Sequence, residues 1–186
     1  MPADRSGALL DVGCGTFPYF LTQVRFARRV GLDRHVADEA PKHPQYPSEA
    51  AGLELHNFDI DHAERLPFDD ATFDVVTMLA VFEHIRPERM PILLSEIERV
   101  LKPGGRVILT TPSWWTERIL TAMAELRLVS AEEIDEHQPH YSPKTIRAAF
   151  ENSNFRGKPV KIGTFELGMN TWAVVEKPSE PRNTRR

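Results

Sequence analysis

The sequence has very little cysteine and no long apolar run. Cys14 is the one cysteine among 186 residues, so neither a disulfide framework nor a cysteine-built zinc site can form within the chain. No segment approaches the roughly 20 consecutive apolar residues that a membrane-spanning helix requires, and the N-terminus has no apolar signal segment. We therefore expect a cytoplasmic protein with no membrane span, no disulfide and no bound metal.

Neither sign of charge dominates the sequence. Lysine and arginine together number 23, and aspartate and glutamate 27, which gives a formal net charge of −4. Because nucleic-acid-binding surfaces are strongly basic, we expect no nucleic acid partner. A chain of this length commonly forms one domain, and a hydrophobic content of 41% is typical of globular proteins. We expect a single domain over residues 1–178, followed by a disordered tail over 179–186.

Aliphatic and β-branched segments alternate with helix-like segments along the first 112 residues. Strands are predicted over 8–13, 29–33, 53–60, 73–79 and 106–112, and helices over 17–29 and 86–101. Such alternation is typical of a parallel sheet that is covered by helices on both faces. Residues 35–51 contain three prolines and little apolar periodicity, which predicts a loop.

The pattern changes after Pro112. An amphipathic helix is predicted over 113–129. A further helix is predicted to begin at Ser142, which suits the N-cap, with Pro143 at the first helical position. Two closing strands, 160–167 and 171–177, flank residues 168–170, whose composition indicates a hairpin.

The first predicted strand ends in a glycine-containing loop, residues 11–15 (DVGCG). Bare backbone at Gly13 and Gly15 can approach a ligand at the carboxyl edge of the sheet, where open α/β sheets bind ligands. A dinucleotide-binding loop needs a third glycine at the position of Pro18, so this loop is poorly suited to a diphosphate. Asp33, at the end of the second strand, is placed to accept hydrogen bonds from both hydroxyls of a ribose. The two observations predict a site for a nucleoside without phosphates.

Five landmarks follow in order along residues 9–112: LLDVGCGT, GLD, ERLPFDDATFDVV, AVFEHI and EIERVLKPGGRVILTTP. Together they resemble the class I S-adenosylmethionine-dependent methyltransferases, in particular those of type 11. The resemblance implies an α/β fold with a Rossmann-like, doubly wound, mostly parallel seven-stranded sheet, an antiparallel last strand and three α/β/α layers. It also implies S-adenosyl-L-methionine as cofactor and S-adenosyl-L-homocysteine as product.

The resemblance further implies which residues hold the cofactor. Backbone of the glycine loop and of the fourth strand's end would approach the methionine portion, and carboxylates would hold the ribose and the adenine. The implied positions are Asp11, Gly13, Cys14 and Gly15 in the loop, Asp33 for the ribose, Asp61 for the adenine amino group with Asp59 and His62 as competing candidates, Ala63 beside the adenine face, and Leu79 and Ala80 at the strand end.

Two features depart from the family's pattern. Phe17 stands where a third glycine is common and Pro18 follows it, so the turn is stiffer and bulkier and cofactor binding is expected to be weaker. The chain also begins almost at the first strand, so we expect the domain to lack the N-terminal helices that often cover the site. The site would then be open, or covered by another chain as in a homodimer.

Methyl transfer from a sulfonium needs no nucleophilic side chain, but a general base helps when the acceptor must lose a proton. Histidine suits that role near neutral pH. His84 follows the fourth strand beside the expected methyl site, although a histidine there can also cap or pack the turn. His137 and His140 lie after the fifth strand, where family members build the acceptor pocket, although a solvated loop explains them equally well.

We expect an S-adenosylmethionine-dependent methyltransferase that methylates oxygen, nitrogen or carbon of a small-molecule acceptor. Two alternatives stay open. One is a methyltransferase-like binding module or partner subunit with little turnover. The other is an NAD(P)-dependent oxidoreductase with a degenerate glycine loop, which Pro18 disfavours and for which no motif supplies a hydride-transfer site.

Overall fold

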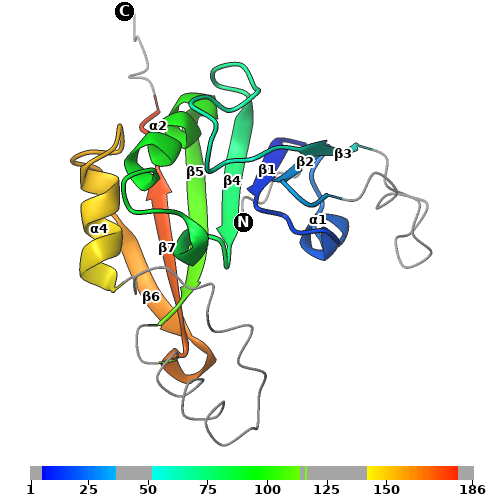
Figure 1. Ribbon diagram of the computed structural model, residues 1–186. Helices are drawn as coiled ribbons and strands as arrows, with labels where there is room; N and C mark the ends of the chain where they lie inside the picture. Colours follow the sequence, from blue (N-terminus) through cyan, green and yellow to red (C-terminus); the bar gives the residue numbers. More distant parts are fainter. Residues whose placement is uncertain (1–5, 37–51, 114–115, 117–141, 180–186) are drawn as a thin grey trace, which may run out of the picture.

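A single mixed sheet organises the molecule (Figure 1). The computed structural model describes residues 6–36, 52–113, 116 and 142–179, and within them seven strands lie in the order β3-β2-β1-β4-β5-β7-β6. The strands are β1 (Ala8–Val12), β2 (Arg28–Asp33), β3 (Leu53–Asn57), β4 (Phe73–Leu79), β5 (Leu101–Pro112), β6 (Lys161–Phe165) and β7 (Asn170–Glu176). β1 to β5 are mutually parallel, whereas β7 runs antiparallel to β5 and β6. The predicted Rossmann-like, doubly wound fold with an antiparallel last strand is confirmed.

Helices pack on both faces of this sheet. They are α1 (Tyr19–Gln23), α2 (Met90–Val100) and α4 (Pro143–Glu151), with short 3-10 turns at η2 (Phe82–His84) and η4 (Glu166–Gly168). Successive residues of a strand point to opposite faces. Leu10 and Val76 therefore join the larger apolar core with α2 and α4, while their neighbours Leu9 and Val75 pack with Leu21 of α1 on the other face. In the described residues no helix is long and apolar enough to cross a membrane.

The first helix is much shorter than the predicted span 17–29. α1 ends at Gln23 because Val24 is already extended and Phe26 packs into the smaller core ahead of β2. The guanidinium of Arg29 in β2 donates to the carbonyl of Leu21 at 3.2 Å, which satisfies one of the free carbonyls of this short helix. The apolar periodicity beyond residue 23 therefore reflects burial of a connecting segment, and the helix prediction was wrong there.

The second helix begins later than predicted. Pro87 disfavours helical backbone at Arg86, and the helix starts at Met90 with Pro91 in its first turn, where the missing N–H costs nothing. It ends at Val100, one residue before β5 begins, so β5 starts earlier than the predicted residue 106.

The closing elements agree with the prediction to within a few residues. Ser142 caps α4, its hydroxyl accepting from the amide of Thr145 at 3.2 Å. β6 and β7 lie within two residues of the predicted strands and pair with each other as a hairpin. Most of the predicted loop 35–51, nearly all of the predicted helix 113–129, the pair His137 and His140, and most of the tail lie outside the described residues.

The landmark ERLPFDDATFDVV is fixed by Arg99 of α2. Its guanidinium donates to the carbonyls of Leu66 and Phe68 at 3.1 and 2.8 Å, and pairs with Asp70 and Glu96 at 2.7 Å each. Glu96 in turn accepts from the amide of Leu66 at 2.9 Å. This network anchors the connection between β3 and β4, whose first residues reach the cleft described below.

Candidate active site

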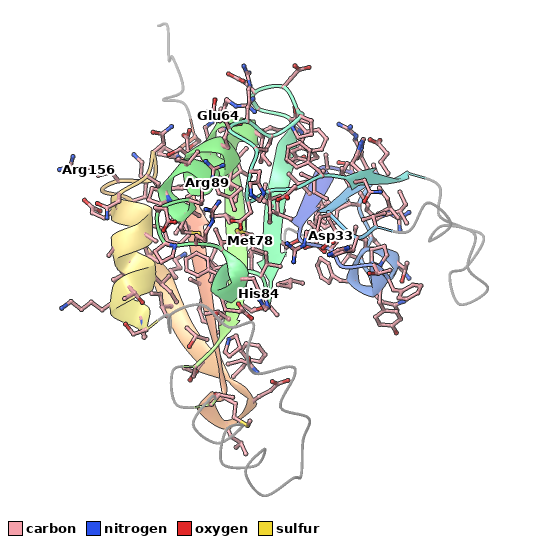
Figure 2. The ribbon with its side chains drawn as sticks, viewed as in Figure 1. Asp33, Glu64, Met78, His84, Arg89 and Arg156 are labelled. Atoms are coloured by element: carbon pink, nitrogen blue, oxygen red, sulfur yellow. The ribbon has the colours of Figure 1, made fainter. Side chains whose placement is uncertain are left out.

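A cleft of about 300 Å³ opens at the carboxyl ends of β1, β2 and β4. Its lining brings together seven of the residues singled out in the sequence: Gly13, Gly15, Asp33, Asp59, Asp61, Ala80 and His84. Figure 2 shows Asp33 and His84 on the same side of the sheet, near the strand ends. The cleft thus occupies the edge at which doubly wound sheets bind ligands.

Five other predicted cofactor residues do not line this cleft: Asp11, Cys14, His62, Ala63 and Leu79. Asp11 is buried in β1, and Cys14 is half-buried within the loop. Nδ1 of His62 lies 2.8 Å from a carboxylate oxygen of Asp59, a lining residue. Leu79 is the last residue of β4. Direct contact of these five with a cofactor stays a prediction.

Six lining residues had not been singled out: Arg34, His35, Phe58, Ile60, Val81 and Ile85. Arg34 and His35 follow Asp33 directly, so the position of Asp33 could have indicated them. Phe58 and Ile60 were assigned to a strand over 53–60, but β3 ends at Asn57 and the chain then turns along the cleft. Val81 gave no sequence signal, because its importance lies in a contact with the distant glycine loop.

The glycine loop turns sharply because both of its glycines adopt left-handed backbone. The φ angles are +76° at Gly13 and +73° at Gly15, and the amide of Gly13 donates to the carbonyl of Leu32 at 2.7 Å. A Cβ at Gly13 would collide with the side chain of Val81, whereas a Cβ at Gly15 would meet nothing within 4 Å. Gly13 is therefore needed for the close approach of the loop to Val81, and Gly15 leaves space open on the cleft side.

Asp33 holds this loop in place. One carboxylate oxygen accepts from the amide of Gly15 at 2.9 Å, and the other accepts from the amide of His35 at 2.8 Å. The two backbone donors fix the orientation of the carboxylate. Each oxygen retains acceptor capacity for a ligand hydroxyl. The same side chain therefore positions the loop and offers acceptors to the cleft.

The two acidic residues after β3 have different environments. Asp59 accepts from the amide of Asp61 at 2.9 Å and from His62 at 2.8 Å, and its bond with His62 lowers the pKa of Asp59 below its usual value. Oδ2 of Asp61 lies 3.5 Å from Nε of Arg86. Oδ1 of Asp61 is buried and has no hydrogen-bond partner among the described residues. A buried acceptor without a donor is costly, so a rotation of the Asp61 side chain that turns this oxygen toward a ligand N–H would be stabilising.

The end of β4 is held in an unusual conformation. Ala80 has a φ of +54°, which non-glycine residues rarely adopt, and its amide donates to the carbonyl of Thr110 at 3.1 Å. Such strain is concentrated at functional sites. The following turn η2 carries His84, which is exposed and lines the cleft. Ala80 and His84 therefore line the cleft together, just after the end of β4.

Asp11 lies in β1, two residues before Gly13, and is 3% exposed. Burial raises the pKa of Asp11 to about 7; the hydrogen bond from Thr77, at 2.6 Å, opposes the rise, and the negative charge of Asp33 adds to it. Burial and the charges of Asp11 and Asp33 also raise the pKa of Cys14 to about 12. Cys14 is therefore a neutral, unreactive thiol at neutral pH.

The raised pKa of Asp11 makes stability depend on pH. The unfolded chain releases this proton near the ordinary pKa of 3.8 and the folded chain near 7, so the contribution of Asp11 to stability is lost as pH rises through that window. In Asp11→Asn, we expect the free energy of unfolding to fall less between pH about 5 and about 8 than in the wild type, by on the order of a few kcal/mol. Urea unfolding at both pH values measures the difference, with the exposed Asp69→Asn as control. If the free energy of unfolding changes by the same amount between the two pH values in Asp11→Asn and in the wild type, the pKa of Asp11 is not raised in the folded chain.

A cleft at the switch point of a seven-stranded sheet with an antiparallel last strand defines a class I, Rossmann-like S-adenosylmethionine-dependent methyltransferase domain. The chain belongs to the methyltransferase domain family, whose model matches residues 1–158.

Two curated relatives and one solved structure illustrate the similarity. Norajmaline N-methyltransferase of Rauvolfia serpentina is 30% identical over 128 residues, which cover 67% of this chain and 41% of that protein. The tRNA N(3)-cytidine methyltransferase METTL2 of Danio rerio is 27% identical over 114 residues, which cover 58% of this chain and 32% of that protein. The solved structure is a complex between the Trm112 methyltransferase activator of Haloferax volcanii and a methyltransferase. Its superposition has a TM-score of 0.70 at 19% identity and covers 96% of this chain and 85% of the matched chain. The chain spans less than half the length of these two curated relatives.

Proposed function

We propose that the protein transfers a methyl group from S-adenosylmethionine to oxygen, nitrogen or carbon of a small-molecule acceptor. The donors and acceptors of the cleft carry this proposal. Asp33 offers acceptors to ribose hydroxyls, the unpaired Oδ1 of Asp61 matches the adenine amino group, and Gly15 leaves room for the methionine portion. Pro18 stands at the start of α1, where a diphosphate would need a free N–H.

Each residue then has a defined task. Asp33 and Asp61 bind and orient the adenosine, and Gly13 and Gly15 allow close backbone approach. When bound, S-adenosylmethionine supplies an activated methyl group. The imidazole of His84 accepts a proton from an acceptor O–H or N–H as the acceptor reacts. Positioning of the two reactants supplies most of the remaining rate enhancement.

Calorimetric titration with S-adenosylhomocysteine and with NADH tests the cofactor assignment. We expect binding of the former and none of the latter; the reverse result would favour an oxidoreductase. A panel of small-molecule acceptors, assayed with tritiated S-adenosylmethionine, then tests turnover. Cofactor binding without transfer to any acceptor would favour a binding module or partner subunit.

A nucleic acid acceptor is the competing substrate class, because one relative is by name a tRNA methyltransferase. The net charge of −4 and the three aspartates of the cleft favour a small molecule over a polyanion, since phosphate binding depends on clustered lysine and arginine. Including tRNA in the acceptor panel separates a nucleic acid acceptor from a small-molecule acceptor.

Gel filtration tests whether the chain forms a homodimer in which a second copy covers the site.

His84→Gln should separate catalysis from cofactor binding. If His84 is the general base, the rate of transfer to a hydroxyl or amine acceptor falls by about 10²-fold or more. The affinity for S-adenosylhomocysteine stays unchanged, because His84 binds the acceptor side. His56→Gln, on the edge strand β3, is the matched control and keeps the full rate. An unaltered rate in His84→Gln would leave that histidine with a packing role.

A further inference from the structure

The carboxyl edge of the sheet carries exposed apolar side chains on both sides of the cleft. The described residues contain five large apolar side chains that are exposed, and four of them lie at this edge. Phe17 and Tyr19, at the start of α1, are 57% and 67% exposed, and Phe165 and Leu167, at the β6–β7 hairpin, are 40% and 99% exposed. The fifth, Ile92, belongs to α2. The two pairs lie apart, so only a ligand that extends beyond the cleft can contact either of them.

The hairpin tip is held rigidly at its base. The carbonyl of Met169 accepts from the amide of Ser113 at 2.8 Å and from the hydroxyl of Thr116 at 2.5 Å. Ser113 directly follows β5, and its hydroxyl lies 3.0 Å from that of Thr171 in β7. These contacts fix the backbone at Met169, two residues from Leu167.

The tip is also strained. Glu166 and Leu167 have φ angles of +51° and +56°, in the left-handed region that costs non-glycine residues about 1–2 kcal/mol each. At 99% exposure Leu167 contributes no burial that offsets this cost. Backbone strain without a folding benefit is typical of residues that serve a ligand.

The tip lies at the same edge as the cleft, several strands away. Pro112 at the end of β5 pairs with Asn170 at the start of β7, so the hairpin extends from the carboxyl ends of the parallel strands, and Figure 1 shows it running past the end of β4. Three strand-to-strand steps separate β4 from β6, which amounts to about 14 Å at about 4.8 Å per step. A ligand whose reacting group lies beside Ala80 must be extended to reach Leu167.

We propose that the acceptor is a lipid-like molecule with a long apolar chain. Its reacting group lies beside Ala80 and His84, and its chain follows the carboxyl edge past Val81 to Phe165 and Leu167. This inference rests on the proposed methyltransferase function. A narrow chain suits this surface, because the exposed apolar side chains described at this edge form two separate pairs and not one broad patch.

Calorimetric titration of the full chain, saturated with S-adenosylhomocysteine, tests the proposal with laurate and butyrate. The two probes share a carboxylate and differ in chain length. We expect laurate to bind about tenfold more tightly or better, since burial of even two methylene groups supplies that factor.

Leu167→Asn removes the apolar side chain at a position where asparagine tolerates left-handed backbone better than leucine does. We expect its laurate affinity to fall toward that of butyrate, with an unchanged affinity for S-adenosylhomocysteine and no loss of thermal stability. Phe165→Ser should act in the same direction. Ile92→Gln removes an exposed apolar side chain from α2 and is the matched control, which keeps the wild-type laurate affinity.

Equal affinities for laurate and butyrate, or for the wild type and Leu167→Asn, would overturn the lipid-like acceptor alone when S-adenosylhomocysteine binds normally. Failure of S-adenosylhomocysteine to bind would overturn the methyltransferase function and the acceptor with it. A dimer that Leu167→Asn dissociates would assign the surface to a second copy of this chain. Binding to phosphatidylcholine vesicles without binding of free laurate would assign it to a membrane. Both of these results overturn the proposal.

Discussion

Gly13→Val is expected to abolish binding of S-adenosylhomocysteine and to lower the free energy of unfolding by about 2–5 kcal/mol. Two effects add at this position. The φ of +76° is unfavourable for any side chain and worst for a β-branched one, and a Cβ there collides with Val81 of the cleft wall. Relief requires movement of the loop or of Val81, and both line the cleft. Calorimetry and urea unfolding measure the two losses.

Gly15→Ala is the matched control for this prediction. Its φ of +73° imposes a similar backbone strain, but the added methyl group meets no protein atom within 4 Å. Its loss of stability should therefore be smaller than that of Gly13→Ala, while cofactor binding should weaken in both. Equal stability losses in the two alanine variants would show that strain acts alone and that the contact with Val81 is unimportant.

The strands were largely predictable because most of them are rich in aliphatic and β-branched residues and end near turn residues. β1 is buried along its whole length, and residues 8–12 are accordingly aliphatic except for Asp11. The antiparallel direction of the last strand, by contrast, has no signal in periodicity, and its prediction came from the resemblance to a family. The segment after residue 23 was misassigned because Phe26 is buried in a connecting segment, and burial there produces the same apolar spacing as a helix.

The site was predictable where backbone geometry dictates the residue type. Left-handed turns favour glycine, and an acceptor at the end of β2 requires a carboxylate, so Gly13, Gly15 and Asp33 could be found from their positions. Val81 could not be found, because its role depends on a contact between segments far apart in the sequence. The unpaired oxygen of Asp61 is equally a property of the folded chain, since the sequence alone does not distinguish it from Asp59.

Asp33→Ala is expected to weaken S-adenosylhomocysteine binding by about a hundredfold or more, since each hydrogen bond to a charged group contributes about 1.5–3 kcal/mol. Two causes contribute to this loss. The ribose hydroxyls lose their acceptor, and the amides of Gly15 and His35 lose the carboxylate that fixes the loop. Asp33→Asn removes the charge and retains one acceptor, so it can satisfy one of these amides but not both.

An analogue of S-adenosylhomocysteine without the ribose 2′-hydroxyl separates the two causes. If Asp33 binds the ribose directly, the analogue has already lost part of that interaction, and Asp33→Ala weakens its binding less than it weakens binding of the parent compound. If Asp33 acts by fixing Gly15 alone, the substitution weakens both ligands by the same factor, because the loop contacts the same methionine portion in each. Calorimetric titration of two ligands against two proteins yields the coupling directly. A coupling of zero would remove the ribose from the role of Asp33 and leave that carboxylate as the residue that positions the glycine loop.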